Sequence, residues 1–312
     1  LDQQFMDQMG SPYLLAHGLG KPVADAETMV TFPTTGTYRV WVRTRDWVGP
    51  WKTLETPEAK LAVGSPGQFQ LIVDGVALET VFGTDEANWH WQDGGSVEIA
   101  EPNVSLALHD LTGFEGRCDA ILFSTDTNLV PPNVDPNMAT WRRELLGLSQ
   151  APVDAGQYDL VVIGGGMAGT CAAVRGARMG LSVALIQDRP VLGGNNSSEV
   201  RVHLLGNTNY DRFPQLGDVV RELDPGYSGN RQAAYQYGDE KKLAVVQAED
   251  NIDLYLNHRG NEVEMDANSI VAVIAQNTQT GERLRFAAPL FADCTGDGCI
   301  GYLAGADYEM TL

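Results

Sequence analysis

Residues 158–173 read Tyr-Asp-Leu-Val-Val-Ile-Gly-Gly-Gly-Met-Ala-Gly-Thr-Cys-Ala-Ala. An apolar run, a glycine turn and the start of a helix follow one another, and Gly164, Gly166 and Gly169 have the spacing G-x-G-x-x-G. The first glycine permits a tight turn, the second lets the backbone approach a pyrophosphate, and the third lets the helix pack on the strand. Because free N–H groups at the start of a helix attract anions, the stretch predicts a diphosphate-binding strand–turn–helix unit.

Two further motifs follow this unit in the sequence. An apolar strand at 182–187 leads to the doublet Gly193-Gly194, and residues 291–306 read Phe-Ala-Asp-Cys-Thr-Gly-Asp-Gly-Cys-Ile-Gly-Tyr-Leu-Ala-Gly-Ala. The three motifs, in this order, resemble the FAD-dependent oxidoreductases of the glutathione-reductase type. The resemblance is strongest to the branch related to succinate dehydrogenase and fumarate reductase flavoproteins. It implies FAD as the cofactor.

The resemblance also implies a set of cofactor-binding residues. The third motif is similar to the family's A-T-G-D flavin motif, with Asp293 at its start, and the residues after the doublet approach the flavin. The backbone near Val263 is expected beside the adenine. The expected contacts are Gly164, Gly166, Gly169, Gln187, Asp188, Gly193, Gly194, Asn195, Asn196, Ser197, Val263, Thr295, Gly296 and Asp297. For Asp297 the alternative is an N-cap of the helix that follows Gly296.

The sequence departs from the family at the end of the second strand. A carboxylate usually stands there and binds the ribose hydroxyls of the adenosine. Here the position holds Gln187, and Asp188 follows it. Either the glutamine amide binds the ribose without charge assistance, or Asp188 reaches in from the strand end. The spacing to Gly193 favours Gln187.

The run after the doublet contains the candidate catalytic residues. If residues 197–203 are extended, then Ser197, Glu199, Arg201 and His203 share one face. Hydride transfer from an alcohol or amine requires a base, and imidazole titrates near neutral pH, so His203 is the candidate base. Arg201 would bind a substrate carboxylate or stabilise negative charge on reduced flavin. The alternative is a structural ion pair between Glu199 and Arg201.

The second half of the chain alternates strand and helix patterns, which predicts a parallel sheet with helices on its faces. We expect a helix over 167–179 that ends at Gly180, a helix through Leu216–Leu223, and a helix capped by Asp239. A β-meander before the third motif completes a Rossmann-like α/β domain over residues 157–312.

The first half reads as short strands separated by turns. Residues 36–45 alternate, with Tyr38, Val40 and Val42 on one face, and an Asp-Gly turn follows the strand that begins at Phe69. The pattern predicts an all-β, jelly-roll-like sandwich over residues 1–126. The order of its features resembles the galactose-binding-like jelly rolls used as carbohydrate-binding modules.

Five of the six tryptophans fall in this half: Trp41, Trp47, Trp51, Trp89 and Trp91. Flat aromatic faces suit sugar rings, but buried aromatics usually serve a core, and packing is the favoured interpretation. Trp47 and Trp51 flank a Gly-Pro loop and are the better candidates for exposed contacts. The proline-rich residues 127–156 are predicted to be a linker with a short helix at its centre.

Composition limits the partners. The chain has 312 residues and a net charge of −20, which argues against nucleic acid and anionic membrane surfaces. No apolar run approaches the ~20 residues that span a bilayer. The four cysteines form no C-x-x-C pair, and no zinc site is expected. The chain begins without methionine and stops just after the third motif, so we expect it to be truncated at both ends.

The leading hypothesis is an oxidoreductase that transfers a hydride from a small polar substrate, such as a sugar or polyol, to non-covalent FAD. The alternatives are a nicotinamide-dependent reductase without flavin and a non-catalytic carbohydrate-binding protein. A sugar-binding module favours a periplasmic or secreted protein over a cytoplasmic one.

Overall fold

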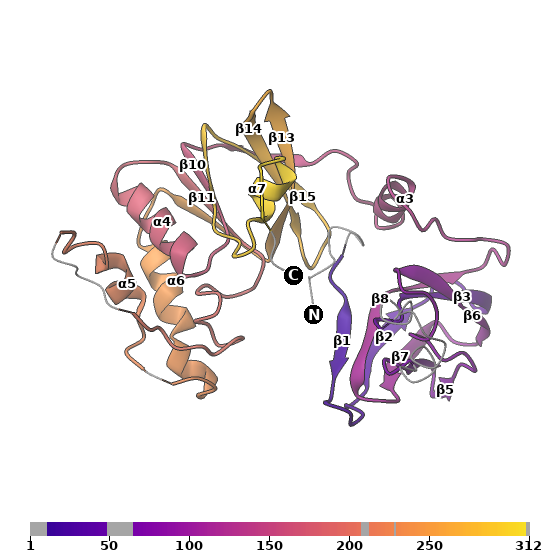
Figure 1. The fold of residues 1–312 in the computed structure, drawn as a ribbon. Helices are drawn as coiled ribbons and strands as arrows, with labels where there is room; N and C mark the ends of the chain where they lie inside the picture. Colours follow the sequence, from indigo (N-terminus) through magenta and orange to yellow (C-terminus); the bar gives the residue numbers. More distant parts are fainter. Residues whose placement is uncertain (1–10, 49–64, 207–211, 228, 310–312) are drawn as a thin grey trace. The chain divides into compact units, whose positions relative to one another are not determined.

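The computed structural model describes residues 11–48, 65–206, 212–227 and 229–309. The chain divides into two compact units, Leu1–Leu146 and Gly147–Leu312 (Figure 1). The boundary divides the predicted 127–156 linker. Residues 127–146 pack with unit 1, while Val153–Gln157 forms a strand of unit 2.

The described part of unit 1 contains two four-stranded antiparallel sheets, with the orders β1-β8-β3-β6 and β2-β7-β4-β5. Its elements are β1 (Leu14–His17), β2 (Ala26–Thr31), β3 (Gly36–Thr44), β4 (Phe69–Val73), β5 (Val76–Ala77), β6 (His90–Ile99), β7 (Asn103–Asp110), β8 (Phe114–Ser124) and α3 (Asn137–Leu145). One hydrophobic core takes side chains from both sheets.

The alternation predicted for β3 is confirmed on its apolar face. Tyr38, Val40 and Val42 are buried in the shared core, because successive side chains of a strand point to opposite faces. The predicted Asp-Gly turn is also confirmed. Asp74 and Gly75 join β4 to β5 with positive φ angles of 48° and 79°, as a tight hairpin turn requires.

The opposite face of β3 holds a buried ion network. The Arg43 side chain is 2% exposed, and its Nε lies 3.2 Å from the fully buried carboxylate of Asp119 on β8. Arg142 of α3 donates to the same carboxylate at 2.7 Å. Asn133 accepts a hydrogen bond from Arg43 and donates one to the carbonyl oxygen of Trp89. Residues 127–146 therefore cover this face of unit 1.

Unit 2 contains a four-stranded parallel sheet with the order β12-β11-β10-β16. These strands are β10 (Leu160–Ile163), β11 (Val183–Gln187), β12 (Ile252–Leu256) and β16 (Leu290–Asp293). The central strand β10 pairs with β11 on one side and with β16 on the other. The later strands β11 and β12 thus lie on one side of β10, and β16 lies on the other. Open parallel sheets bind ligands at the carboxyl ends of the strands where the strand order reverses in this way.

Two layers cover the parallel sheet. A second sheet of β13 (His258–Asp266), β14 (Ser269–Asn277), β15 (Arg283–Ala287) and β9 (Val153–Gln157) shares one core with it. The helices α4 (Met167–Arg178), α5 (Asp218–Leu223) and α6 (Asp239–Gln247) lie on the other side of β10 and β11 from β13 and β14 (Figure 1). Val161 and Ile163 face the core between the two sheets, and Val162 faces the core between the parallel sheet and the helices. Both faces of β10 are therefore apolar.

The predicted helices are confirmed with two adjustments. Helix α4 ends as expected, with Gly180 in the left-handed region at a φ of 92°. Helix α5 begins at Asp218, so Leu216 lies outside it and is exposed. The N-cap of α6 is Gly238 rather than Asp239. The short 3₁₀ helix η2 (Ala234–Tyr237) precedes α6, and α7 (Cys299–Leu303) follows the third motif.

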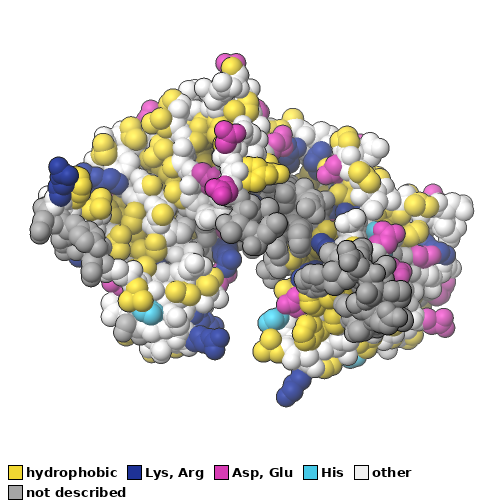
Figure 2. Space-filling model, viewed as in Figure 1, with side chains coloured by type: hydrophobic (Ala, Val, Ile, Leu, Met, Phe, Trp, Pro, Cys, Tyr) yellow, Lys and Arg dark blue, Asp and Glu magenta, His cyan; other side chains and the backbone are white. Residues whose placement is uncertain are grey.

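The described surface shows no segregation of charge on the face drawn in Figure 2, where acidic and basic side chains are interspersed. Within the described residues, no helix is both long and apolar enough to cross a membrane.

The buried network of unit 1 generates a stability prediction. Asp119→Asn leaves Arg43 and Arg142 without their shared counter-charge, and we expect the free energy of unfolding to fall by about 3–5 kcal/mol. The control is Asp93→Asn, which breaks a half-exposed pair with Arg39 and should cost at most about 1 kcal/mol. Denaturant unfolding followed by tryptophan fluorescence measures both. Equal, small losses would contradict the burial argument.

Candidate functional site

Two glycine turns meet at the carboxyl ends of β10 and β11. The Gly193 N–H donates to the carbonyl oxygen of Gly165 at 2.8 Å, and Gly166 and Gly193 form an isolated parallel bridge. The turns are 27 residues apart in the sequence and in contact in the fold. The first motif and the doublet therefore form one continuous site.

The glycines of the first turn are required by close backbone contacts. A Cβ on Gly164 would lie 2.2 Å from the carbonyl oxygen of Cys294, and its φ of 103° disfavours any other residue. A Cβ on Gly169 would lie 1.8 Å from the carbonyl oxygen of Gly164. Helix α4, the first turn and the end of β16 thus pack backbone to backbone.

Gly166 has room for a Cβ, which would make only an ordinary van der Waals contact. Gly166 is the N-cap residue of α4, with a φ of −64°, and the nearest heavy atom to an added Cβ would be the Gly194 Cα at 3.9 Å. The first helical hydrogen bond of α4 runs from the Thr170 N–H to the Gly166 carbonyl, so the N–H groups before it have no partner within the helix. Open space, free N–H groups and a positive helix end fit a diphosphate.

Gln187 holds the first turn in place. Its side chain is 3% exposed; Oε1 accepts a hydrogen bond from the Gly165 N–H at 2.7 Å, and Nε2 donates to the Val191 carbonyl at 3.1 Å. A carboxylate could accept the first bond but could not donate the second, which explains an amide here. Asp188 is more accessible, with its carboxylate 3.8 Å from the Arg259 guanidinium. Ribose binding by either residue stays a prediction.

The third motif is organised around Asp293, at the end of β16. Its carboxylate accepts hydrogen bonds from the N–H groups of Thr295, Ile300 and Gly301 and from the Thr295 hydroxyl. Burial would raise the pKa of Asp293, but these hydrogen bonds outweigh burial and lower it.

The alternative interpretation of Asp297, as the N-cap of α7, is wrong. Asp297 is exposed, Gly298 is the N-cap residue, and the Thr295 hydroxyl accepts from the Cys299 N–H. No atom of the described residues lies within 4 Å of a Cβ on Gly296, so the turn presents an open surface next to the first glycine turn. Contact of Thr295, Gly296 and Asp297 with a cofactor remains a prediction.

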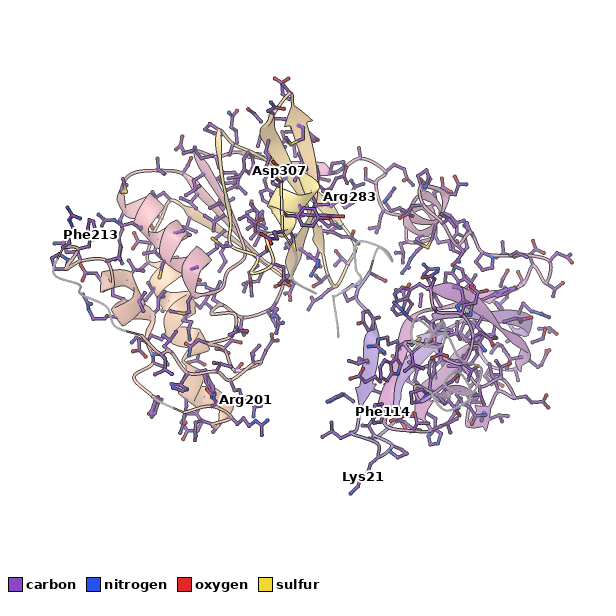
Figure 3. All side chains as sticks on the ribbon, in the orientation of Figure 1. Lys21, Phe114, Arg201, Phe213, Arg283 and Asp307 are labelled. Atoms are coloured by element: carbon purple, nitrogen blue, oxygen red, sulfur yellow. The ribbon has the colours of Figure 1, made fainter. Side chains whose placement is uncertain are left out.

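The expectation of an extended strand at 197–203 is wrong. The segment turns back on itself, with the Val202 N–H bonded to the Asn195 carbonyl and Arg201 at a positive φ of 62°. Ser197 is buried, whereas Arg201 is exposed at the surface of unit 2, where Figure 3 labels it. Glu199 lies 3.4 Å from Arg189, and no ion pair with Arg201 is found among the described residues.

His203 is held by Asn230. Its Nδ1 and its backbone N–H both lie within hydrogen-bond distance of Asn230 Oδ1, at 2.7 and 3.0 Å. An amide oxygen only accepts, so Nδ1 carries a proton and Nε2 of the neutral ring keeps its lone pair. The geometry is compatible with a base at Nε2, although the shared face that motivated the catalytic group does not form.

Two buried polar atoms follow the doublet without a partner. Asn196 Oδ1 and Ser197 Oγ have no hydrogen-bond partner in the described structure, although the Asn196 amide nitrogen donates to the Val202 carbonyl. A buried polar atom is costly until it is satisfied. Both residues therefore fit contact with a bound group, as the sequence predicts for them.

Helix α6 contributes two side chains to this site that no sequence pattern predicted. The Asp239 carboxylate, expected to cap its own helix, accepts the Ser198 N–H at 3.0 Å instead. One turn later the side chain of Lys242 is fully buried against Gly193. Helical spacing shows that the two residues are neighbours, but 41 or more residues separate them from the loop that they contact.

The remaining features are the predicted adenine contact Val263, the two cysteines of the third motif and the absence of a metal site among the described residues. Val263 lies on β13, opposite Val273, at the edge of the core between the two sheets. Cys294 and Cys299 are free. The described residues contain no group of three or more His, Cys, Asp or Glu side chains placed to hold a metal ion.

Unit 1 uses most of its described tryptophans for packing. Trp89 is buried against Tyr13, and Trp91 packs edge-on against Trp141 and donates to a backbone carbonyl. Trp47 is half-buried and stacks on Phe114, which is 44% exposed (labelled in Figure 3). Trp51 lies outside the described residues.

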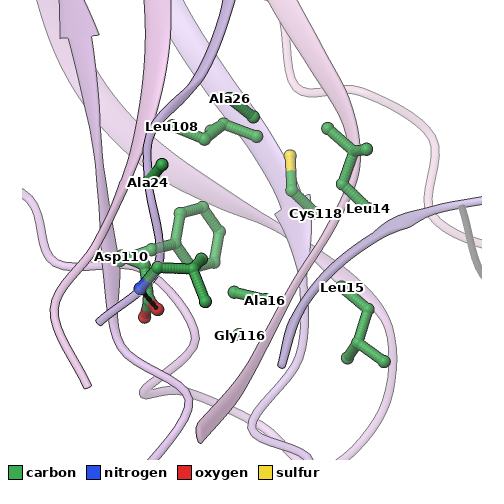
Figure 4. Close-up of a pocket in the computed structure, with 11 residues that line it drawn as sticks. Leu14, Leu15, Ala16, Ala24, Ala26, Leu108, Asp110, Gly116 and Cys118 are labelled. Atoms are coloured by element: carbon green, nitrogen blue, oxygen red, sulfur yellow. Dashed lines mark hydrogen bonds between the residues drawn. The ribbon is translucent and has the colours of Figure 1, made fainter. Parts of the chain in front are cut away.

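A pocket of about 190 Å³ opens between β1 and the neighbouring strands of unit 1 (Figure 4). Leu14, Leu108, Phe69 and Cys118 line it, and most of its wall is apolar. Its carboxylate, Asp110, already accepts the N–H groups of Val23, Thr112 and Gly113. Such a lining does not suit a sugar, because sugar hydroxyls require polar partners.

Comparison with known proteins links unit 2 to flavoenzymes. Residues 159–311 match the family model described as FAD dependent oxidoreductase. A 39-residue segment is 54% identical to mitochondrial dihydrolipoyl dehydrogenase of Schizosaccharomyces pombe, and it covers 12% of this chain and 8% of that protein.

Among solved structures, Thermovibrio ammonificans THI4 is similar with a TM-score of 0.37 and 14% identity, over 55% of this chain and 69% of that one. Mycobacterium smegmatis Sdh1 is similar with a TM-score of 0.31 and 17% identity, over 45% of this chain and 34% of that one. The chain thus spans a small part of its curated relative and about a third of the mycobacterial protein. The assignment of unit 2 rests on the family model.

The two glycines of the first motif generate opposite predictions. Gly169→Ala forces a Cβ against the Gly164 carbonyl oxygen, and we expect a loss of several kcal/mol of stability or no soluble protein. Gly166→Ala meets no such contact and should change stability by less than about 1 kcal/mol. Its methyl group fills the open space, so we expect affinity for ADP or FAD to fall at least about tenfold. Thermal unfolding and calorimetric titration measure the pair; unchanged nucleotide affinity in Gly166→Ala would refute the site.

Proposed function

We propose that the protein transfers a hydride from a small polar substrate to non-covalent FAD, on the premise that residues 159–311 match the family model described as FAD dependent oxidoreductase. The finer placement, in the glutathione-reductase-type branch related to succinate dehydrogenase and fumarate reductase flavoproteins, is also proposed. It is supported by the order of the three sequence motifs.

The observation that carries the proposal is the cradle at Gly166. The N-cap of α4, the Gly193-Gly194 turn and the open surface at Gly296 meet at the carboxyl ends of β10, β11 and β16. A dinucleotide diphosphate requires a site of this kind, where backbone N–H groups are accessible and no side chain intervenes.

The chain's own residues have distinct roles in this proposal. Gly166 and the first turn of α4 bind the diphosphate, and Asn196 and Ser197 offer buried polar atoms to the cofactor. His203, oriented by Asn230, takes the substrate proton at Nε2. Bound FAD supplies the hydride acceptor. Arg201 and Glu199 stay candidates for substrate binding, although both are placed at the surface.

We further propose that unit 1 is a carbohydrate-binding module and that the oxidised substrate is a sugar or polyol. Support comes from the pair of antiparallel sheets, which is compatible with a jelly-roll-like sandwich, and from the exposed Phe114 ring backed by Trp47. The Arg117 guanidinium lies 5.4 Å from the Trp47 ring centroid and gives this platform a polar neighbour.

Flavin binding tests the main proposal. We expect the purified protein to show visible flavin absorption that is released on denaturation, and we expect a sugar or polyol to bleach it anaerobically. His203→Gln should keep the flavin and slow bleaching by about 10²-fold or more, as the loss of a general base does. A colourless protein that refuses added FAD but binds NADH would favour the nicotinamide alternative. One that binds neither would favour the non-catalytic alternative.

Polysaccharide binding tests the module. We expect Phe114→Ala to weaken retention of the full chain on immobilised polysaccharide at least about fivefold, because stacking contributes about 1 kcal/mol. Phe213→Ala is the matched control, since Phe213 is 60% exposed in unit 2. Equal retention of wild type and both variants would contradict sugar binding at the aromatic platform. If the wild type is not retained, the proposal that unit 1 is a carbohydrate-binding module is wrong.

A further inference from the structure

Helix α6 carries a buried lysine behind the nucleotide cradle. The chain has five lysines, at 21, 52, 60, 241 and 242. Of the three that the structure describes, Lys21 and Lys241 are exposed and Lys242 is 0% exposed. A fully buried lysine is rare unless its charge is paired, because burial of an ammonium group is costly.

The side chain of Lys242 fills the place of a missing Cβ. A Cβ built on Gly193 would lie 2.9 Å from Lys242 Cε and 3.0 Å from Cδ. The aliphatic part of the lysine thus packs against the backbone of the doublet. The Asn196 carbonyl oxygen is closer still, at 2.3 Å from that Cβ, and the φ of 108° at Gly193 also favours glycine. The ammonium nitrogen is bonded to this Cε atom, and it donates to the Tyr237 carbonyl oxygen.

The doublet connects this charge to the diphosphate cradle. Gly193 bonds to Gly165, and a Cβ on Gly194 would lie 3.0 Å from the Cα of Gly166, the N-cap residue of α4. The backbone of Gly193 and Gly194 is therefore the layer between Lys242 and the open space at Gly166.

The surroundings of the ammonium group are short of compensating charge. The described residues give it one hydrogen bond, to the Tyr237 carbonyl. Burial lowers the pKa of Lys242, and Asp239 and Asp224 oppose that shift. The Asp239 carboxylate is also engaged by the Ser198 N–H. An anion on the far side of the doublet would add the missing compensation, since charges interact strongly where water is excluded.

We propose that Lys242 is a positioning residue for the cofactor diphosphate, which supports the Gly193-Gly194 turn and supplies a buried positive charge beneath it. The inference rests on the proposed function, because it requires a diphosphate at Gly166. It adds to the glycine motif a charge that comes from a different helix. In a chain with a net charge of −20, such a local charge counteracts repulsion of the anionic cofactor.

The test compares two neighbouring lysines. Lys242→Met keeps the aliphatic packing and removes the charge, whereas Lys241→Met removes an exposed charge whose ammonium group donates to the Asp224 carbonyl oxygen. The affinities of each variant for ADP and for adenosine are measured by titration. Loss of phosphate recognition lowers only the affinity for ADP, whereas a change in loop structure lowers both affinities. We expect Lys242→Met to weaken ADP at least about tenfold and to leave adenosine within about twofold, an effect of the size that one buried charge exerts.

The outcomes separate the inference from the proposed function. Equal losses for ADP and adenosine would overturn the electrostatic role and show loop collapse. Unchanged ADP affinity in Lys242→Met would overturn it entirely, while FAD binding by the wild type would still support the proposed function. Wild type that binds neither ADP nor FAD would refute both.

A second measurement on the wild type covers the case in which Lys242→Met does not fold. With five lysines in the chain, ¹³C labelling at Cε gives a resolvable set of signals. We expect ADP to shift the Lys242 signal and adenosine to leave it in place. A Lys242 signal unmoved by saturating ADP would overturn the inference.

Discussion

The structure of unit 2 depends on how closely bare backbone segments approach one another at the carboxyl ends of β10, β11 and β16. A Cβ on Gly169 or Gly164 would lie about 2 Å from a carbonyl oxygen, and the Gly193 N–H reaches the Gly165 carbonyl. This contact fixes the start of α4 against the sheet. Because the turns carry no side chains, N–H groups and the positive end of α4 stay accessible to an anion.

The same close approach determines which side chains support the site from behind. Gln187 uses both ends of its amide to hold the first turn, and Asp239 and Lys242 reach the second turn from α6. Backbone atoms thus line the open side of the cradle, and polar side chains support its buried side. Such an arrangement limits reorganisation when an anion binds, since its donors are already oriented.

Sequence patterns predicted much of this architecture. Glycine spacing predicted the strand–turn–helix unit that ends at Gly180, and the alternation around Val40 predicted a strand with one buried face. The errors concern residues whose partners are distant. Asp239 was expected to cap its own helix but bonds to Ser198, and the pattern did not predict that residues 127–146 cover Arg43. Residues 197–203 turn back because the buried Asn196 amide holds Val202.

By itself, the sequence determined the existence and order of the glycine turns, since a positive φ or a close backbone contact requires glycine wherever it occurs. It also determined the apolar strands, because periodicity is local. Only the tertiary structure decided that the turns at Gly166 and Gly193 meet, that Gln187 is engaged in holding one of them, and that Lys242 lies beneath the other. These contacts join segments far apart in the chain, and their geometry depends on how sheet and helices pack, which no local pattern encodes.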